Sequence, residues 1–533
     1  MGLDTIDKQS GKPSYMSHAS QPPLAFSLVT VRLRTLFQQM DAGAASLERL
    51  ASRLWLPALL AALALIAYPI LLDARFRSIR NDEFFTWHVV HQNSFTGILN
   101  ALLRGADNHP PLDYFTRLVS IRIAGDTLLG FRLPSVIGFL VACLSLFALI
   151  RPVAGTLAAF VALLLPVSTF PYTLAAEGRS YAISLGCAGL ALLCWRAAAE
   201  GRYRPLALAG LWISLAAAVS LHYYGVFLLL PVAAAEAVHI AQRRRLDKAI
   251  LAALLLSAAA LVALLPFILF SRRYASTFWS PVNANAVLLA LFQLFQYASW
   301  PVLLILLIWI AGRWPSSAEW LHKPEAPLWA ASLALLANWC AVYIAAATVT
   351  HAFSVRYIGA SVLGCALITA LHLRHRPFLA ALLLALLAKN ALYYLRHGET
   401  APVTPVIRPK NWQSQQPLVF GSSHDFAMQV FHAPAGDQTR LVYLIDPAAS
   451  RQIIGHDTAD VGLSNLSRAV PLHLEPYERF LREHPRFTLI SGSDPQIDWV
   501  SRRIVAEKAH LVLREVVSGR LVWDVDLTPA APR

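Results

Sequence analysis

Long apolar segments recur along the first 395 residues and restrict what this chain can fold into. A helix that crosses a membrane needs about 20 mostly apolar residues. Only 14% of the chain is charged, compared with roughly 25% in soluble domains. We therefore predict a polytopic α-helical membrane protein with about 11 transmembrane helices, near residues 55–72, 127–150, 153–171, 180–198, 205–221, 223–241, 249–270, 287–312, 327–349, 356–373 and 377–395.

The distribution of lysine and arginine predicts how these helices are oriented. Alternate short loops carry basic residues, among them Arg151, Arg196, Arg243 and Arg374, and we assign these loops to the cytoplasm. Residues 1–50 then form a cytoplasmic tail with an amphipathic piece at its end, and residues 51–397 form the transmembrane domain. The large first periplasmic loop, 74–126, is also basic, which suits an anionic ligand. The net charge of +14 does not indicate nucleic-acid binding, because no basic patch is interleaved with aromatic residues.

Beyond residue 397 the composition changes to short apolar runs that are typical of strands. These runs are 417–421, 440–446, 486–491 and 511–527, and a short helix is expected at 475–484. We predict that residues 398–533 form a small α/β domain that ends in a strand hairpin and lies in the periplasm. The sequence GSSHD at 421–425 resembles a hydrolase nucleophile elbow, but that motif requires glycine where Asp425 stands.

Unusual polar side chains fall in the loops on the outer side of the predicted topology. They are carboxylates, histidines, arginines and tyrosines close to the ends of predicted spans. The candidate site residues are Asp82, Glu83 and His109 in the first loop, Glu177, Arg179 and Tyr181 in the second, His222 and Tyr223 in the third, Arg272 in the fourth, and Arg356 and Tyr357 in the fifth. Their convergence predicts one site at the outer boundary between membrane and water.

The residue types at this site suit transfer of a group from a lipid-linked phosphate. Arginine is a planar donor that stays charged and binds phosphate in a bidentate manner. A carboxylate such as Asp82 or Glu83 can act as the general base for an attacking hydroxyl or amine.

The same residues also fit purely structural roles. Tyrosines near span ends commonly anchor helices at the membrane interface, and Arg272 can extend its side chain to lipid headgroups. His222 can bond to a neighbouring helix, and Glu177 and Arg179 can pair with each other alone, without binding a ligand.

A bound divalent cation is a further alternative. His88 and His91 lie one helical turn apart, with His109 and the first-loop carboxylates nearby in the sequence. No recognised ligand spacing is present, so no metal ligand is assigned.

The order of these motifs resembles a known family. The Asp82–Glu83 pair is followed by HPPL at 109–112, E-x-R-x-Y at 177–181, HYYG at 222–225 and R-Y at 356–357. This order resembles the GT-C superfamily of membrane glycosyltransferases over about residues 55–395, in particular the family 39 and 83 group of protein O-mannosyltransferases and aminoarabinose transferases. The resemblance implies that Asp82 is the catalytic base and that Arg179 and Arg356 bind the donor phosphate. It also implies that Glu83 and His109 are site residues.

By this resemblance the protein is an inverting glycosyltransferase of a bacterial inner membrane. It would move a sugar from a polyprenyl-phosphate donor to a lipid, glycan or protein acceptor at the periplasmic face. A lipid-linked saccharide transporter or flippase and a polysaccharide ligase stay open as alternatives. A transporter is expected to hold its ionisable groups near the bilayer midplane, whereas the candidate residues cluster at one rim.

Overall fold

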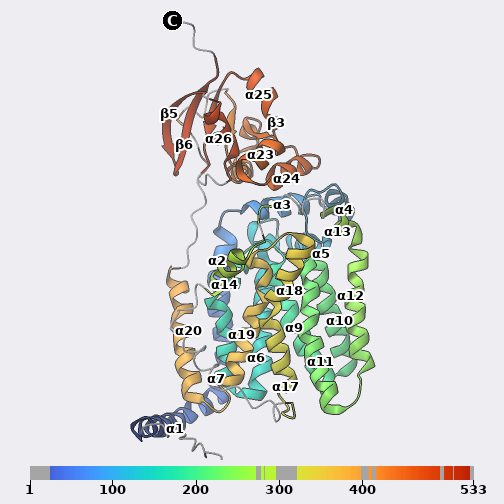
Figure 1. Ribbon diagram of the computed structural model, residues 1–533, viewed down its shortest axis with the longest axis vertical. Helices are drawn as coiled ribbons and strands as arrows, with labels where there is room; N and C mark the ends of the chain where they lie inside the picture. The colour runs from blue at the N-terminus through green and yellow to red at the C-terminus, as the bar shows by residue number, and fades with distance from the viewer. Residues whose placement is uncertain are drawn as a thin grey trace, which may run out of the picture.

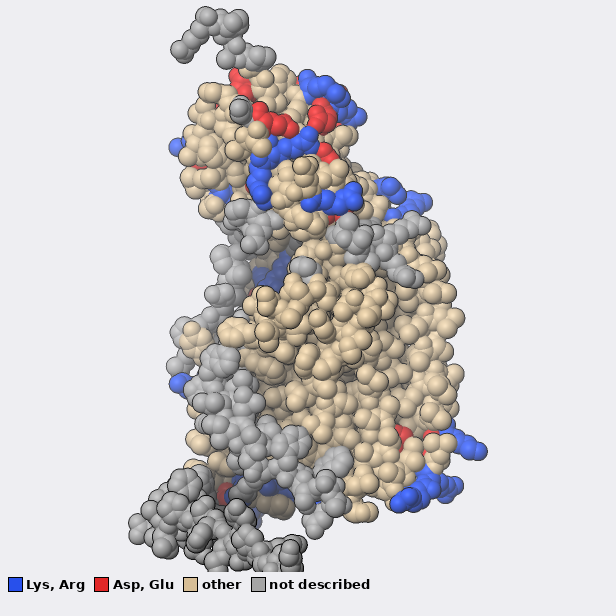
Figure 2. Space-filling model, viewed as in Figure 1, with Lys and Arg blue, Asp and Glu red and all other residues tan. Residues whose placement is uncertain are grey.

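The protein is described by a computed structural model that covers residues 24–271, 278–280, 282–295, 321–397, 407, 409–410, 416–492, 497–507 and 509–528. A bundle of long helices carries a smaller domain with a β-sheet at one end, and helix α1 (Leu24–Arg53) lies at the opposite end (Figure 1). On the face that Figure 2 shows, a wide uncharged region covers the bundle, and charged side chains lie on the sheet domain and at the opposite end. This distribution is that of a protein that spans a membrane.

Seven helical segments among the described residues are long and apolar enough to cross a membrane. They are α2 (Trp55–Phe76), α6 (Leu128–Ala154), α9 (Tyr181–Ala199), α10 (Arg204–Leu221), the run Tyr223–Arg243 with η2 (Tyr223–Leu228) and α11 (Leu229–Arg243), the run Ala326–Thr350 with α17 (Ala326–Leu336), α18 (Asn338–Ala345) and η4 (Ala346–Thr350), and the run Val355–His372 with η5 (Val355–Ile358) and α19 (Ala360–His372). A bent pair, α12 (Lys248–Ala263) and α13 (Leu265–Ser271), meets the same test as one unit with a 56° bend.

Shorter apolar helices occupy the positions of the other predicted spans. They are Thr156–Ser168, which contains α7 (Thr156–Leu164) and η1 (Leu165–Ser168), then α14 (Ala284–Phe295) and an apolar stretch of α20 (Pro377–His397). Figure 1 shows α7 and α20 running alongside the longer helices. Most of the segment predicted at 287–312 lies outside the described residues. The polytopic helical fold that the sequence predicts is confirmed.

Small residues let the central helices α6 and α9 approach each other closely. A Cβ atom added to Gly138 would meet the backbone of Ala182 and Ile183, and one added to Gly189 would lie 2.8 Å from Ser145 Cβ. Membrane helices associate through such close contacts, because lipid offers no hydrophobic driving force between them.

Acidic residues of α1 cap two helices of the bundle at the end opposite the sheet domain. The Glu48 carboxylate accepts hydrogen bonds from the backbone nitrogens of Thr156 (2.6 Å) and Leu157 (3.0 Å) at the start of α7. Asp41 accepts one from Phe378 N (3.1 Å) at the start of α20. Carboxylates stabilise helix N-termini, where backbone N–H groups lack partners. The end of the predicted tail is thus a helix fixed to the bundle.

The first loop folds into three short helices that lie between the bundle and the sheet domain. They are α3 (Asn81–Val90), α4 (Phe95–Leu103) and α5 (Pro111–Ala124). Ser94 Oγ caps α4 by accepting a hydrogen bond from Gly97 N (2.9 Å), and Pro111 begins α5. Proline suits the first turn of a helix, because its missing N–H would have no partner there. The HPPL motif therefore ends a loop and starts a helix.

The sheet domain contains a six-stranded sheet with the order β3-β2-β1-β4-β6-β5. Strands β1 to β4 run parallel to one another, and β6 pairs antiparallel with β4. Strands β5 and β6 form the antiparallel hairpin that the sequence predicts. The strands are β1 (Leu418–Phe420), β2 (Leu441–Ile445), β3 (Leu474–Pro476), β4 (Arg486–Ile490), β5 (His510–Val517) and β6 (Arg520–Asp526). The helices are α21 (Ser423–His432), α22 (Ala435–Gln438), α23 (Pro447–Ile454), α24 (Thr458–Leu466), α25 (Tyr477–Glu483) and α26 (Trp499–Ala506).

One apolar core joins the sheet domain to the first-loop helices. Phe84 of α3 and Phe131 of α6 belong to the same buried cluster as Phe420 and Phe426 of the sheet domain. The rings of Trp87 and Phe431 meet edge to face with centroids 5.3 Å apart. Figure 1 shows α24 next to α3. This shared core fixes the sheet domain over one end of the bundle.

Candidate functional site

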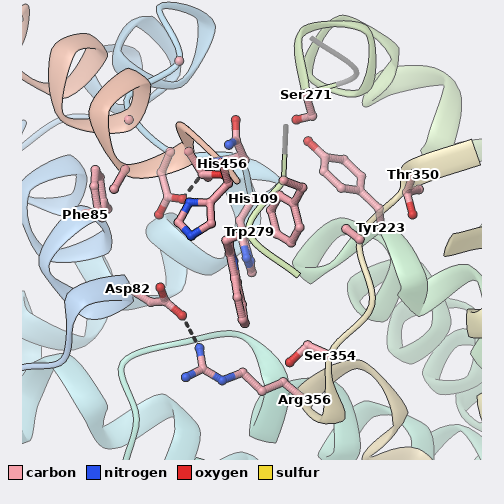
Figure 3. A pocket seen from close by; sticks show the side chains of 18 of the residues that line it. Asp82, Phe85, His109, Tyr223, Ser271, Trp279, Thr350, Ser354, Arg356 and His456 are labelled. Carbon is pink, nitrogen blue, oxygen red and sulfur yellow. Dashed lines mark hydrogen bonds and ion pairs between the residues drawn. The ribbon is translucent and has the colours of Figure 1, made fainter. Parts of the chain in front are cut away.

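A cavity of about 650 Å³ lies where the bundle, the first loop and the sheet domain meet. Figure 3 shows Asp82 and Arg356 paired with each other in its lining. From the bundle and the first loop, its lining includes Asp82, Phe85, Asp107, His109, Arg179, Tyr181, His222, Tyr223, Trp279, Arg356 and Tyr357. From the sheet domain, it includes Ser423, His424, Tyr443, His456 and Asp460. Most of the predicted site residues are therefore brought together, although they come from distant parts of the sequence.

Asp82 stands in the first turn of α3 and forms an ion pair with Arg356, which belongs to η5. Burial alone would raise the pKa of the Asp82 carboxyl, but Arg356 and Arg179 outweigh burial and lower it below its ordinary value of 3.8. The carboxylate is thus ionised at neutral pH and lies in a partly buried, positively charged wall.

Arg179 is fixed from one side by a set of oxygen acceptors. Its Nη1 donates to Asp107 Oδ2 (2.7 Å) and to the backbone oxygen of Asp82 (3.0 Å), and it also bonds to the Thr86 hydroxyl. The side chain is only 6% exposed. A guanidinium held in this way is preorganised, and it can present its other nitrogens to an anion.

Four predicted aromatic residues form a cluster beside the arginines. The His222 ring centroid lies 5.0 Å from those of His109 and Tyr357, and 5.5 Å from that of Tyr181. His222 Nδ1 accepts a hydrogen bond from Tyr224 N (3.2 Å). Burial, and then Arg179, hold the pKa of His109 well below its ordinary value of 6.5. A neutral His109 has one ring nitrogen that donates and one that accepts a hydrogen bond.

Glu83 lies behind the cavity and does not line it. Its carboxylate accepts hydrogen bonds from Arg132 Nε (2.7 Å) and Nη2 (2.8 Å), from Gly178 N (2.5 Å) and from Arg80 N (2.9 Å). Burial raises its pKa, but the Arg132 guanidinium outweighs burial and lowers the pKa to about 2. The Glu83 carboxylate is thus ion-paired with Arg132. Its hydrogen bonds join α3, α6 and the loop before α9.

The remaining predicted residues differ in where they lie. Glu177 pairs with Arg80 rather than with Arg179, whose partner is Asp107. Tyr223 lines the cavity wall (Figure 3). Arg272 lies outside the described residues.

The histidines considered for a metal site are separated in the fold. His88 meets the Phe84 ring with centroids 4.4 Å apart, and His91 Nε2 bonds to Asp126 Oδ1 (2.9 Å). Neither lines the cavity that contains His109. Over the described part of the chain, no three His, Cys, Asp or Glu side chains are grouped as metal ligands would be.

Sequence reasoning missed two groups of cavity residues. Asp107 stands two positions before His109 in DNHPPL, so its proximity to that motif was the available signal. Tyr443, His456 and Asp460 of the sheet domain stand in no recognisable catalytic motif, and His424 stands in the GSSHD run, which lacks the glycine of the hydrolase motif. They reach the cavity because of how the sheet domain is placed, which local patterns do not reveal.

Part of the chain matches a known family of glycosyltransferases. Residues 108–270 match the family described as dolichyl-phosphate-mannose-protein mannosyltransferase. No curated protein matches the sequence.

The fold is similar to that of ArnT from Cupriavidus metallidurans. For the apo crystal structure of ArnT, the TM-score is 0.54 at 12% identity, covering 91% of this chain and 100% of that chain. For its crystal structure bound to undecaprenyl phosphate, the TM-score is 0.50 at 12% identity, covering 90% of this chain and 99% of that chain. Together with the match over residues 108–270, this likeness identifies the chain as a polytopic membrane protein with the fold of the GT-C superfamily of glycosyltransferases.

Proposed function

We propose that this protein is a glycosyltransferase that moves a sugar from a polyprenyl-phosphate donor to an acceptor. The observation that carries the proposal is the meeting of Asp82 with Arg356 and Arg179 in one cavity at the end of the bundle. Transfer of a sugar from a phosphate leaving group requires a general base, which the carboxylate can supply. It also requires positive charge to stabilise the leaving phosphate, which the two guanidiniums can supply. The likeness to ArnT, which has been crystallised with undecaprenyl phosphate, supports a polyprenyl-linked donor.

The cavity offers separate surfaces for the two parts of such a donor. Arg179 and Arg356 supply charge-assisted donors for the phosphate. Leu265, Ile268 and Leu269 of α13 supply an apolar part of the same lining, which suits the first units of an isoprenoid chain.

In the proposed reaction an acceptor hydroxyl attacks the anomeric carbon of the donor sugar from the face opposite the phosphate. A new carbon–oxygen bond forms while the bond from the anomeric carbon to the phosphate oxygen breaks, which inverts the configuration. The polyprenyl phosphate leaves with the electron pair and is stabilised by the arginines. Asp82 takes the proton of the attacking hydroxyl.

The donor phosphate and Asp82 would compete for the same guanidinium. In the protein without ligands, Arg356 pairs with Asp82. A phosphate bound to Arg356 would weaken that pair and leave the carboxylate available to the acceptor hydroxyl. Donor binding would therefore also prepare the base.

We assign the cavity to the periplasmic face of a bacterial inner membrane, with the N-terminus in the cytoplasm. The basic short loops support this orientation. The position of α1 and of the sheet domain at opposite ends of the bundle is consistent with it (Figure 1).

The position of the charged groups favours an enzyme over a transporter. Transporters bind their substrates near the bilayer midplane, between structural repeats. Here Asp82, Arg179 and Asp107 lie where the bundle meets the sheet domain. A polysaccharide ligase would use the same site chemistry, and the identity of the acceptor separates it from other transferases.

The direct test is transfer of label by the purified protein. The full chain in lipid nanodiscs is incubated with radiolabelled polyprenyl-phosphate sugars and a membrane extract. We expect label in an extract fraction, together with release of polyprenyl phosphate. Absence of both with every donor tested contradicts the proposal.

A further inference from the structure

The sheet domain covers the cavity with the carboxyl ends of its parallel strands. Strand β1 lies between β2 on one side and β4 on the other, so the strand order reverses at β1. In open α/β sheets, ligands bind outside the carboxyl ends of the strands at such a point. The segments that follow β1 and β2, namely the start of α21 and the α23–α24 turn, line the cavity.

Two polar side chains of this cover have atoms available for a ligand. Asp460 is 1% exposed, and its Oδ1 has no hydrogen-bond partner among the described residues. His456 Nδ1 is likewise buried and unpartnered there. Both residues line the cavity. A buried polar atom without a hydrogen bond lowers the stability of the fold unless a ligand or a water molecule supplies that bond.

The backbone holds these groups in place. Gly455 ends α23 with φ of 85°, a conformation that glycine adopts without strain, and Ser450 Oγ bonds to the His456 carbonyl oxygen (2.8 Å). Asp460 stands in the first turn of α24. Tyr443 of β2 accepts a hydrogen bond from Trp499 Nε1 (3.1 Å), which orients its hydroxyl.

The cover has no permanent positive charge toward the cavity. None of the sheet-domain residues that line it, within the described part of the chain, is Lys or Arg. Burial lowers the pKa of His456 and of His424, so both imidazoles are neutral at pH 7. Burial raises the pKa of Asp460 to about 7, so this carboxyl can donate or accept a hydrogen bond near neutral pH. Among the described residues on this side of the cavity, an anionic group would find no positively charged partner, whereas hydroxyl groups would find both hydrogen-bond donors and acceptors.

Aromatic rings stand beside these polar groups. Phe85 of α3 lines the cavity and lies against α24, where a Cβ atom added to Gly462 would be 3.3 Å from its ring. Trp279 lines the cavity as well (Figure 3). Polar groups that bond hydroxyls, next to rings that cover an apolar ring face, are features of a sugar site. A peptide would instead require backbone partners, as at a free strand edge.

We propose that Tyr443, His456 and Asp460 form the acceptor subsite, and that the acceptor is a neutral, hydroxyl-bearing sugar. This inference rests on the proposed glycosyltransferase function. The donor phosphate takes the arginine side of the cavity, the acceptor sugar takes the sheet-domain side, and Asp82 lines the same cavity. The sheet domain thereby determines which acceptor is used.

The experiment measures sugar transfer by the full chain in nanodiscs to a matched pair of soluble probes. The probes are methyl β-glucoside and methyl β-glucoside 6-phosphate, which differ by one phosphate, and N-acetylserine methylamide serves as the peptide-like probe. We expect a kcat/KM for the neutral glucoside at least about tenfold above that for either other probe. Higher values for the phosphorylated or the serine probe overturn the proposal, as does no transfer to the glucoside while the wild type transfers sugar to a membrane extract.

Variants test the assignment of the residues. Asp460→Asn, His456→Gln and Tyr443→Phe are each expected to raise KM for methyl β-glucoside about tenfold, the value of roughly one hydrogen bond, with a smaller effect on kcat. Glu483→Gln, an exposed carboxylate of α25 outside the cavity, is the matched control. Thermal unfolding identifies variants that fail to fold. Tyr443→Phe removes only the hydroxyl and keeps the shape of the side chain, so this variant tests the assignment even if the others do not fold.

The outcomes separate this inference from the proposed function. A wild type that transfers no sugar from any donor contradicts the function itself. A wild type that transfers sugar, with folded variants whose glucoside KM is unchanged, overturns the acceptor subsite alone. Variants that raise the KM for the donor instead would assign these residues to the donor sugar, and this result also overturns the acceptor subsite.

Discussion

The carboxylate of Asp82 is paired with the guanidinium of Arg356, a residue 274 positions later in the chain. The pair joins the first loop to the segment that precedes α19. Arg179 binds the backbone oxygen of the same Asp82 (3.0 Å), so both arginines and the carboxylate form one unit.

Asp82→Asn is expected to reduce turnover by at least about 100-fold, because the amide keeps the shape of the side chain but removes the basic lone pair. Donor binding should be unchanged or tighter, since the variant frees Arg356 for the phosphate. Steady-state kinetics with a radiolabelled donor gives both quantities. Asp126→Asn, an exposed first-loop carboxylate bonded to His91, is the control. Near-normal turnover of Asp82→Asn would remove Asp82 from the mechanism.

Arg356→Lys and Arg179→Lys are expected to raise the donor KM at least about tenfold or to abolish turnover. Lysine keeps the charge but cannot form two parallel hydrogen bonds to a phosphate. Arg374→Lys is the matched control, because Arg374 pairs with Glu325 (2.5 Å) and lies outside the cavity lining. Unchanged donor affinity in alanine variants of both cavity arginines would show that the phosphate binds elsewhere.

The pH dependence should differ between the free and the donor-bound enzyme. In the free enzyme the arginines hold the Asp82 pKa below 3.8. The acid limb of the kcat/KM profile, where protonation of Asp82 lowers kcat/KM, should therefore lie below that pH. A bound phosphate offsets the positive charge, which raises the pKa of Asp82, and the acid limb of kcat should then lie at higher pH. Rate profiles at low and saturating donor concentration measure both limbs. Coincident limbs would mean that the phosphate does not bind next to Asp82.

The sequence predicts those features that depend on local composition. Apolar length identifies the spans, and strand-like runs identify β1, β2 and β4 at almost the observed positions. The candidate residues converge because alternate loops emerge on the same side, so topology alone brings Asp82, His109, Arg179, His222 and Arg356 to one cavity.

The sequence does not predict which charges pair. Glu83 bonds to Arg132, 49 positions away, although Arg80 is closer in the sequence. Arg179 bonds to Asp107, 72 positions away, although Glu177 is close by. Such choices depend on how the first-loop helices pack on α6 and α9. The position of Asp460 over the cavity likewise depends on a shared apolar core that no local motif encodes.

The sheet domain is predicted to lie in the periplasm. Alkaline phosphatase fused after Leu395 should be active, because this enzyme folds only outside the cytoplasm. A fluorescent protein inserted in the basic loop at 243–245 should fluoresce, since the positive-inside rule assigns that loop to the cytoplasm. An inactive phosphatase fusion that is nevertheless expressed would reverse the orientation and move the cavity to the cytoplasmic face.

Glu83→Gln should act mainly on stability, and its effect separates Glu83 from Asp82. The carboxylate is fully buried and bonded twice to Arg132, so the variant leaves a buried guanidinium without its counter-charge. Breaking one partner of a buried pair costs about 3–5 kcal/mol. Glu200→Gln is the control, because Glu200 is 33% exposed and pairs with Arg196 at the surface, where a pair contributes about 0–1 kcal/mol.

The pH dependence of unfolding gives an independent readout for the same pair. Since the folded-state pKa of Glu83 is lowered from 4.5 to about 2, its stabilising contribution is complete above pH 4.5 and is lost as the pH falls through about 2. Thermal unfolding in detergent should show wild type and Glu83→Gln converging as the pH falls through this window. A Glu83→Gln protein with wild-type thermal stability and at least 100-fold lower turnover, on the order of loss of a general base, would instead make Glu83 a catalytic residue.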